Sequence, residues 1–216
     1  IEFFGGVPRV KHFVSAFCAD DCFDYDQGFQ GKGQFWVAIQ DPDNGDRGGE
    51  HDGGTDPEDG EPYAKPTIYN ATYTGRGIDA GKRIITFRDN AGGHYYNSIF
   101  AGWGKGIDVE KLSSGEDSYK RFLNGDLSLS DNIFYDVASS GTSATEDNIF
   151  KVSFNGSDDN GEGTIFTASF AANNNVVADP GISYEFELGG YQLVPTQGPV
   201  FDAAAPVDNW FDNVNY

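Results

Sequence analysis

Carboxylates are concentrated in one short stretch near the start of the chain, Asp20-Asp21-Cys22-Phe23-Asp24-Tyr25-Asp26. If this stretch is a β-strand, its side chains alternate, which places Asp20, Asp24 and Asp26 on one face and Asp21 on the other. Three carboxylates on one face suit calcium, a hard cation that prefers oxygen ligands. The sequence therefore predicts a calcium site at Asp20, Asp24 and Asp26, and the alternative is an acidic corner exposed to solvent.

The Asp20-Asp21 pair has a second interpretation, because it resembles the paired aspartates of polygalacturonases. These are β-helix hydrolases that use carboxylates as acid and base. The resemblance implies that Asp20 and Asp21 are catalytic in an alternative in which the protein degrades polysaccharide. A lyase would instead need a base beside calcium-neutralised carboxylates, and Lys32 and Arg88 are the candidates. Where polygalacturonases have Gly-His-Gly, this chain has Gly92-Gly93-His94, so we expect a non-catalytic protein.

The two cysteines, Cys18 and Cys22, are separated by one short turn. Their spacing suits a small disulfide loop, which persists in an oxidising compartment rather than in the cytosol. The histidines His12, His51 and His94 do not complete a zinc site with them, and none has a nucleophile partner at a recognisable turn. We therefore predict a disulfide between Cys18 and Cys22, but neither a zinc site nor a catalytic triad.

Short alternating segments recur along the chain and predict the element that carries these residues. The clearest pair is 68–75 (IYNATYTG) and 95–102 (YYNSIFAG), in which Asn70 and Asn97 are in register. Weaker copies occur at 10–14, 131–135 and 147–150, and a second type of strand precedes them at 1–6 and 85–90. A repeat of several short strands is typical of a solenoid. We therefore predict an all-β, right-handed parallel β-helix.

The domain boundaries follow from where this pattern stops. Residues 1–178 are predicted to form the coils, residues 179–216 an irregular C-terminal cap, and residues 41–62 a long acidic surface loop rich in glycine and proline. One short helix is expected from about Gly115 to Leu123, on a lateral loop. Asn70 and Asn97 could stack as an amide ladder at a corner of the coil.

Five aromatic residues have two possible roles. If they point outward on adjacent coils, they could form a stripe on which sugar rings stack. If they point inward they fill the core, which is the more common situation and the one we expect. The residues are Phe35, Trp36, Tyr95, Tyr96 and Trp103.

Composition excludes several classes of function. The formal net charge of −20 repels nucleic acids and anionic lipid surfaces, so we expect neither as a partner. No apolar run is long enough for a transmembrane helix, so membrane insertion is not expected. The chain starts at Ile1 and contains no methionine, which favours a processed product or a fragment.

Three segments, 1–6 (IEFFGG), 18–36 (CADDCFDYDQGFQGKGQFW) and 208–216 (DNWFDNVNY), resemble a group of secreted or cell-surface bacterial β-helix proteins frequent in Bacteroidetes. The resemblance implies an extracellular or outer-surface location, export like that of type IX secretion cargo, and further coils upstream of Ile1. The group implies no common activity. We therefore expect a structural or adhesive module, stabilised by calcium, that binds polysaccharide or a surface protein or forms part of a larger assembly.

Overall fold

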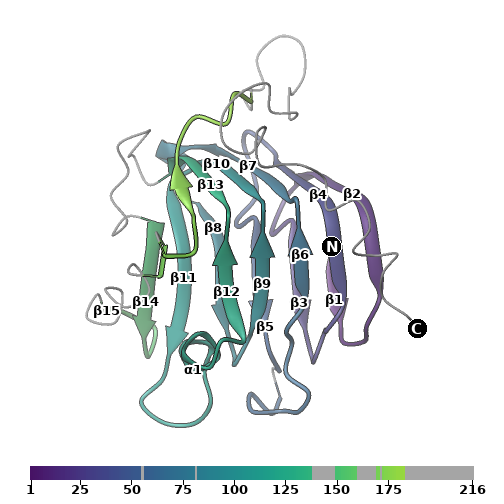
Figure 1. The fold of residues 1–216 in the computed structure, drawn as a ribbon, viewed down its shortest axis with the longest axis vertical. Helices are drawn as coiled ribbons and strands as arrows, with labels where there is room; N and C mark the ends of the chain where they lie inside the picture. The colour runs from purple at the N-terminus through teal and green to yellow at the C-terminus, as the bar shows by residue number, and fades with distance from the viewer. Residues whose placement is uncertain (55, 81, 138–148, 160–168, 171, 183–216) are drawn as a thin grey trace.

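A computed structural model describes residues 1–54, 56–80, 82–137, 149–159, 169–170 and 172–182. It consists almost entirely of short strands (Figure 1). The elements in chain order are β1 (Glu2–Phe4), β2 (Arg9–Cys18), β3 (Phe23–Asp26), β4 (Lys32–Gln40), β5 (Gly49–Asp52), β6 (Thr67–Tyr69), β7 (Thr72–Gly77), η1 (Ile78–Ala80), β8 (Arg83–Arg88), β9 (Gly93–Tyr96), β10 (Ile99–Trp103), β11 (Lys105–Lys111), α1 (Ser118–Leu123), β12 (Leu127–Ser130), β13 (Ile133–Val137), β14 (Phe150–Phe154), β15 (Ser157–Asp159) and β16 (Val176–Val177).

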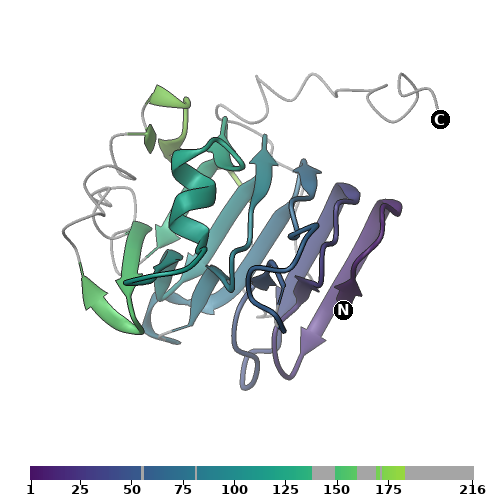
Figure 2. The same ribbon diagram turned by 90° about the horizontal axis from the view of Figure 1, so that it is seen from below.

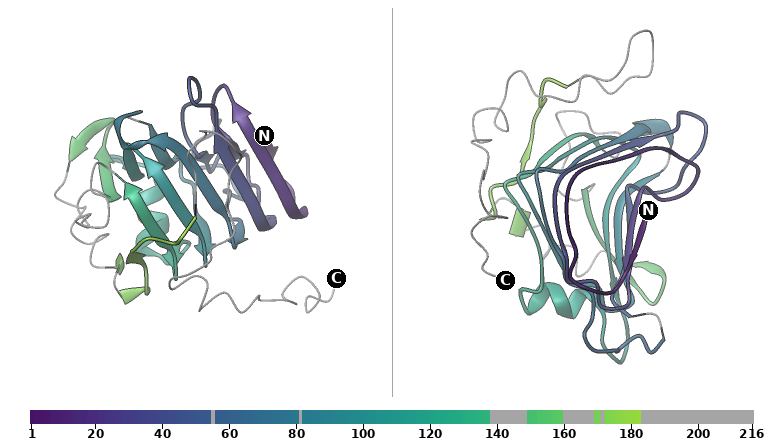
Figure 3. Two further views of the ribbon diagram at one scale, coloured as in Figure 1. Left: turned by 90° about the horizontal axis from the view of Figure 1, so that it is seen from above. Right: turned by 90° about the vertical axis from the view of Figure 1, so that its right-hand side faces the viewer.

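The strands form two sheets that wind around a common axis. The seven-stranded sheet has the order β1-β3-β5-β8-β11-β14-β15, parallel except where β15 pairs with β14. The nine-stranded sheet is parallel and branches, because β4 pairs with β6 along its first half and with β7 along its second. Its first branch, the early parts of β2 and β4 followed by β6, β9 and β12, is called the second face below. Coils stack along the axis, and Figure 2 and Figure 3 show them from the side and end-on.

Aromatic side chains fill the space between the sheets. Phe23 from the seven-stranded sheet stacks on Trp36 and on Tyr73 from the nine-stranded sheet, with ring centroids 4.8 and 5.4 Å apart. All three rings are at most 1% exposed, and burial of each such side chain stabilises the fold by roughly 2–3 kcal/mol. Glycine is required beside the indole of Trp36, since a Cβ at Gly33 would lie 2.5 Å from it. The two sheets that enclose this core confirm the all-β parallel β-helix predicted from the repeats.

The chain turns between the two branches of the nine-stranded sheet through one residue with positive φ. In the middle coils that residue is Asn70 or Asn97, with φ of 55° and 50°. Asn and Asp tolerate this region better than other side chains because their polar groups bond locally. The residues that occupy the same corner in successive coils are His12, Phe35, Asn70, Asn97, Asp131 and Asn174.

The amide ladder at this corner is one residue later than predicted. The side chain of Asn132 accepts the N–H of Ser98 at 2.8 Å and donates to the side chain of Asn175 at 3.0 Å. Both asparagines are at least 96% buried. Asn70 and Asn97 are not in this ladder, because the positive φ at their position determines the bend, and the next residue points inward.

Three further expectations from the repeats can be compared with the strands. The register Thr72↔Ile99 confirms the alignment of 68–75 with 95–102. The prediction that 147–150 repeats the strand at 131–135 is wrong, because β14 pairs with β11 in the seven-stranded sheet. In the nine-stranded sheet the partner of Ile133 is Val176. The expected helix is present but starts at Ser118, since the side chain of Asp117 caps it by accepting the N–H of Lys120.

The acidic segment 41–62 is not one surface loop. It contains strand β5, which joins the seven-stranded sheet between β3 and β8. The alternation of buried Gly49 and His51 with half-buried Glu50 and Asp52 was hidden by the many acidic residues and glycines around it. The last described strand, β16, ends at Val177, and residues 183–216 of the expected cap lie outside the described residues.

Candidate functional site: the acidic face of the seven-stranded sheet

The outward side of the seven-stranded sheet carries two rows of carboxylates. Inward positions hold Phe23, Tyr25, His51 and Phe87, so the alternating positions lie on the outer side of the sheet, where Asp26 is only 6% exposed. The first row runs in register through Glu2, Asp24, Glu50, Thr86 and Asp108. The second row contains Asp26, Asp52, Arg88 and Glu110, with Asp52 paired to Arg88. We call this surface the acidic face.

Two arginines brace the acidic face. Arg88 makes a bidentate contact with Asp52, at 2.8 and 3.2 Å, and reaches Glu50 at 3.0 Å. Arg47 contacts the same Oε1 atom of Glu50 at 2.8 Å and Asp21 at 3.3 Å. Glu50 is therefore held between two guanidinium groups. The resulting chain of ion pairs links three successive coils.

The arginines do not neutralise the whole face. Burial raises the pKa of Asp24 to about 7, and the charges of Asp21 and Glu50 act in the same direction. Burial also raises the pKa of Asp89 to about 6, with Asp52 adding to the effect. Burial raises the pKa of Glu110 as well. Burial is the main cause in each case, so the charged form of these carboxylates is disfavoured, and a bound cation would favour it.

Carboxylate clusters flank both edges of the acidic face. Asp20, Asp21 and Asp46, which precede β3 and β5, each offer an oxygen within 4.8 Å of the others. At the opposite edge, Glu58, Asp89 and Glu110 meet the same criterion. Because β3, β5, β8 and β11 run parallel, segments before these strands meet at one edge and segments after them at the other.

The predicted trio Asp20, Asp24 and Asp26 does not converge on one point. Asp24 and Asp26 do share the outward side of β3, where Asp24 accepts the N–H of Glu50 at 3.0 Å. Asp20 instead joins Asp21, because β3 begins only at Phe23 and strand alternation does not extend back to residue 20. The calcium site remains a prediction, with Asp20 and Asp24 in neighbouring groups of the same acidic surface.

The candidate catalytic residues differ in environment, although Asp20 and Asp21 lie in one carboxylate cluster. Asp21 is 8% exposed and paired with Arg47, whereas Asp20 is exposed. Arg88 lies on the acidic face, but its contact with Asp52 raises its pKa further. Lys32 lies on the second face, away from these carboxylates.

The histidines occupy three different environments. His51 points into the core, where its Nε2 lies 2.7 Å from the hydroxyl of Tyr95. Burial lowers its pKa to about 3. His94 lies on the second face, with Nδ1 2.8 Å from the Ser128 hydroxyl, and His12 is at the corner described above.

Cys18 and Cys22 are free thiols in the structure. The Ser15 hydroxyl lies 2.9 Å from the sulfur of Cys18 and donates to the carbonyl of Cys22 at 2.9 Å. A hydrogen bond from the Cys22 thiol lowers the pKa of Cys18 to about 6. Both cysteines are therefore reduced in the structure, and the disulfide between Cys18 and Cys22 remains a prediction.

Part of this site was not predicted from the sequence. Arg47, Glu50 and Asp52 form the centre of the ion-pair chain, but they were assigned to a surface loop. The signal that could have identified them is the alternation in 49–52 (GEHD), which matches that in 23–26 (FDYD). In both segments a carboxylate follows an inward residue.

The fold and the face define a class of protein, an extended parallel β-helix with a carboxylate-rich outer sheet. Residues 1–174 match the family described as the pectate-lyase like beta helix domain, and the chain belongs to this family. No curated protein and no solved structure matches the chain. Within the described residues, no helix has the length and apolar character needed to cross a membrane.

Proposed function

We propose that the chain is an extracellular or cell-surface β-helix module, non-catalytic, in which calcium bound at the acidic face stiffens a scaffold that adheres to glycans or proteins. The observation that carries this proposal is the pair of carboxylate clusters at the edges of the acidic face, each with oxygens within 4.8 Å of one another, and the raised pKa of Asp24 supports it. Like charges in adjacent strands destabilise a sheet. A divalent cation would remove that repulsion and tie neighbouring coils together.

The location is part of the same proposal. Family members with this type of domain are usually extracellular, and the resemblance to Bacteroidetes surface proteins suggests export in the manner of type IX secretion cargo. In an oxidising compartment the adjacent Cys18 and Cys22 would form a disulfide beside the first coils. Mass spectrometry of protein recovered from the cell surface, before and after reduction, tests both points; a free dithiol would contradict the disulfide.

Calcium-dependent thermal unfolding tests the proposal directly. Calcium about 100-fold above its dissociation constant should raise Tm by about 5 °C or more relative to chelated protein. The double variant Asp20→Asn/Asp24→Asn should lose this shift. The matched variant Asp79→Asn/Asp131→Asn removes two exposed carboxylates elsewhere and should keep it. An identical Tm with calcium and with chelator in the wild-type protein would rule out the calcium site.

A second candidate is a polysaccharide lyase, and one observation favours it. Arg88 lies among carboxylates that could hold calcium, so a base and a metal site share one surface. Against it, Arg88 is fully engaged by Asp52 and holds its proton more firmly than a free arginine. Release of unsaturated oligosaccharides from an acidic polysaccharide with calcium, lost in Arg88→Gln, would establish the lyase and overturn the non-catalytic role.

A further inference from the structure

The turn from β2 to β3 brings together the two cysteines of the chain and a buried serine. Cys18 is the last residue of β2, and Cys22 directly precedes β3. Cys22 is 0% exposed, whereas Cys18 is only half-buried. A molecule in solution can therefore reach Cys18 but not Cys22.

The hydroxyl of Ser15 contacts both cysteines. Its Oγ lies 2.9 Å from the sulfur of Cys18 and 2.9 Å from the carbonyl oxygen of Cys22. A hydroxyl has a single hydrogen, so while it donates to the carbonyl, the Cys18 thiol must be the donor to Oγ. When Cys18 loses its proton, the hydroxyl can turn and donate to the sulfur instead. Ser15, which is 6% exposed, is therefore placed to stabilise a thiolate at Cys18.

The contacts between the two cysteines give them different chemistry. The hydrogen bond from the Cys22 thiol lowers the pKa of Cys18 to about 6, against the effect of burial, and Ser15 and the amine of Ile1 act in the same direction. The pKa of Cys22 is raised, first by this hydrogen bond, then by burial and by the charge of the Cys18 thiolate. In thiol–disulfide exchange the nucleophile is the thiolate. One residue of the pair is therefore a nucleophile, and the other keeps its proton.

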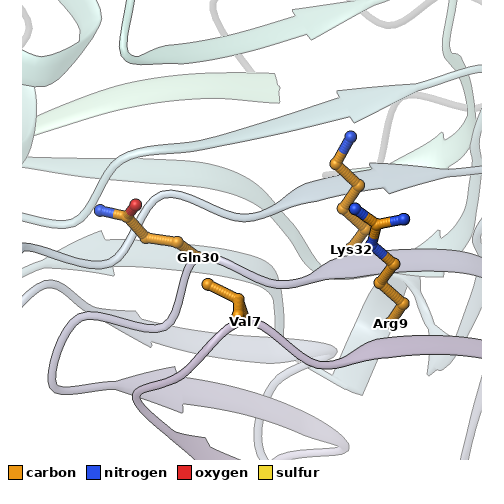
Figure 4. A pocket seen from close by; sticks show the side chains of 4 residues that line it. All are labelled: Val7, Arg9, Gln30 and Lys32. Carbon is orange, nitrogen blue, oxygen red and sulfur yellow. The ribbon is translucent and has the colours of Figure 1, made fainter. Parts of the chain in front are cut away.

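The surroundings of Cys18 favour a positively charged partner. Asp20, in the same turn, is exposed, and the chain has a formal net charge of −20. A pocket at the other end of β2 is lined by Val7, Arg9, Gln30 and Lys32 (Figure 4). Its cations do not offset the charge near Cys18, because almost the whole of β2 separates Cys18 from Arg9. A strongly charged protein attracts small ions of opposite sign, so cationic disulfides should reach Cys18 more often than anionic ones.

We propose that Cys18 and Cys22 form a thiol–disulfide exchange site for small cationic disulfides, in which Cys18 attacks and Cys22 resolves. The Cys18 thiolate attacks one sulfur of the substrate R–S–S–R, a mixed disulfide forms, and a first thiolate RS⁻ leaves. Cys22 then loses its proton, attacks the sulfur of Cys18 and displaces the second RS⁻. The protons lost by the two cysteines are taken up by the two leaving thiolates. The substrate is thus reduced by two electrons, and the protein is oxidised to the Cys18–Cys22 disulfide.

The order of the two steps follows from the same contacts. While Cys18 is ionised, its charge and its hydrogen bond keep the proton on Cys22. A mixed disulfide at Cys18 is uncharged and a weak acceptor, so both effects end and only burial still opposes ionisation. Cys22 therefore becomes a nucleophile only after Cys18 has reacted. The pair reacts once unless an external thiol reduces it again, so the inference goes beyond the proposed scaffold without making it an enzyme.

The test mixes reduced protein at pH 7, in chelator, with cystamine, which is cationic, or with glutathione disulfide, which is anionic. Mass spectrometry of acid-quenched samples follows the mixed and the intramolecular disulfide. Relative to the neutral thiol N-acetylcysteine amide, the protein should favour cystamine by about threefold or more at low salt, and less at high salt. Cys22→Ser should accumulate a mixed disulfide at Cys18. Cys18→Ser should react about tenfold more slowly or less, since Cys22 is buried and keeps its proton.

Ser15→Ala tests the positioning role of the hydroxyl. The pH midpoint for alkylation of Cys18 by iodoacetamide should rise by about half a unit or more, the equivalent of one lost hydrogen bond. Ser15→Thr, which keeps a hydroxyl, should restore the midpoint. The matched control Ser130→Ala removes a hydroxyl from β12 and should leave it unchanged.

Three results would overturn the inference. These are a preference for glutathione disulfide, first modification at Cys22 in the wild-type protein, and no reaction of folded protein while urea-unfolded protein reacts fully. The last result would mean that the two cysteines are inert buried thiols. Because the experiment is made in chelator, its outcome does not depend on the proposed calcium site, and a missing calcium shift would leave the exchange site unaffected.

Discussion

The acidic face and the second face belong to the same coils and cover the same aromatic core, yet their outward rows have opposite chemistry. The seven-stranded sheet presents carboxylates braced by Arg47 and Arg88. The second face presents cations and tyrosines without a carboxylate in its strands. In a solenoid the inward positions are fixed by packing and the outward positions are not. Each outward row can therefore acquire one chemistry over several coils.

The two sheets also differ in what holds successive coils together. The acidic face uses partly exposed ion pairs, whereas the corner of the nine-stranded sheet uses the buried amides of Asn132 and Asn175. Exposed ion pairs contribute little each and respond to ions. Buried amides contribute more, because their loss leaves unpaired polar groups without water. Substitutions on the two sides should therefore differ in size and in their response to calcium.

Asn132→Ala should have the largest effect. It removes the side-chain bonds to the N–H of Ser98 and the carbonyl of Tyr95, while Asn175 keeps only the backbone N–H of residue 132 as a partner from this position. We expect a loss of about 3 kcal/mol or more in the free energy of unfolding, measured by urea titration. Calcium should not restore the lost stability. The control variant Ser130→Ala should change the free energy of unfolding little. Recovery of the Asn132→Ala variant in calcium would remove the distinction between the two sides.

Arg88→Gln should cost about 1–2 kcal/mol in chelator, since three partly exposed charge contacts are lost and Glu50 and Asp52 then face each other. This loss of stability should shrink in calcium, because the cation replaces the guanidinium charge. The loss caused by Asn132→Ala should not. Lys105→Gln on the same sheet is the control. A calcium-independent loss would indicate that Arg88 stabilises the sheet by packing rather than by charge.

Asp24→Asn should change how stability depends on pH. The raised pKa means that folded protein binds more protons than unfolded protein between about pH 4 and pH 7, so the wild-type free energy of unfolding falls as pH rises through this window. Asparagine keeps the acceptor for Glu50 and removes the charge. The variant should be more stable by about 1–2 kcal/mol at pH 8 in chelator, after allowance for partial exposure.

The matched variant Asp79→Asn removes an exposed carboxylate and should leave the pH profile unchanged. In calcium the order should reverse, since only wild-type protein retains the carboxylate ligand. If the Asp24→Asn variant follows the wild-type profile from pH 4 to pH 8 in chelator, Asp24 is not the uncompensated charge of the acidic face.

The sequence predicted the fold because the repeat that carries Asn70 and Asn97 reflects the bend between two strands. It did not predict which asparagines form the ladder, since bending and stacking occupy adjacent positions and both favour Asn. The carboxylates of β3 were identified by their clustering. Arg47 and Glu50 were not, because pairing between strands far apart in sequence decides which loops contain a hidden strand.

The smallest effect is expected inside the same sheet, where His51 stacks on Tyr25 with ring centroids 3.8 Å apart. Its pKa is lowered to about 3 by burial, so unfolded protein binds the extra proton below about pH 6.5 and stability is lost as pH falls, opposite to Asp24. His51→Phe should reduce the loss between pH 7 and pH 5.5 by about 1 kcal/mol. Chemical denaturation at the two pH values measures this difference independently of any packing change common to both. An unchanged difference would mean that His51 is accessible to protons in the folded state, and that the sheet does not separate a charged exterior from a neutral interior.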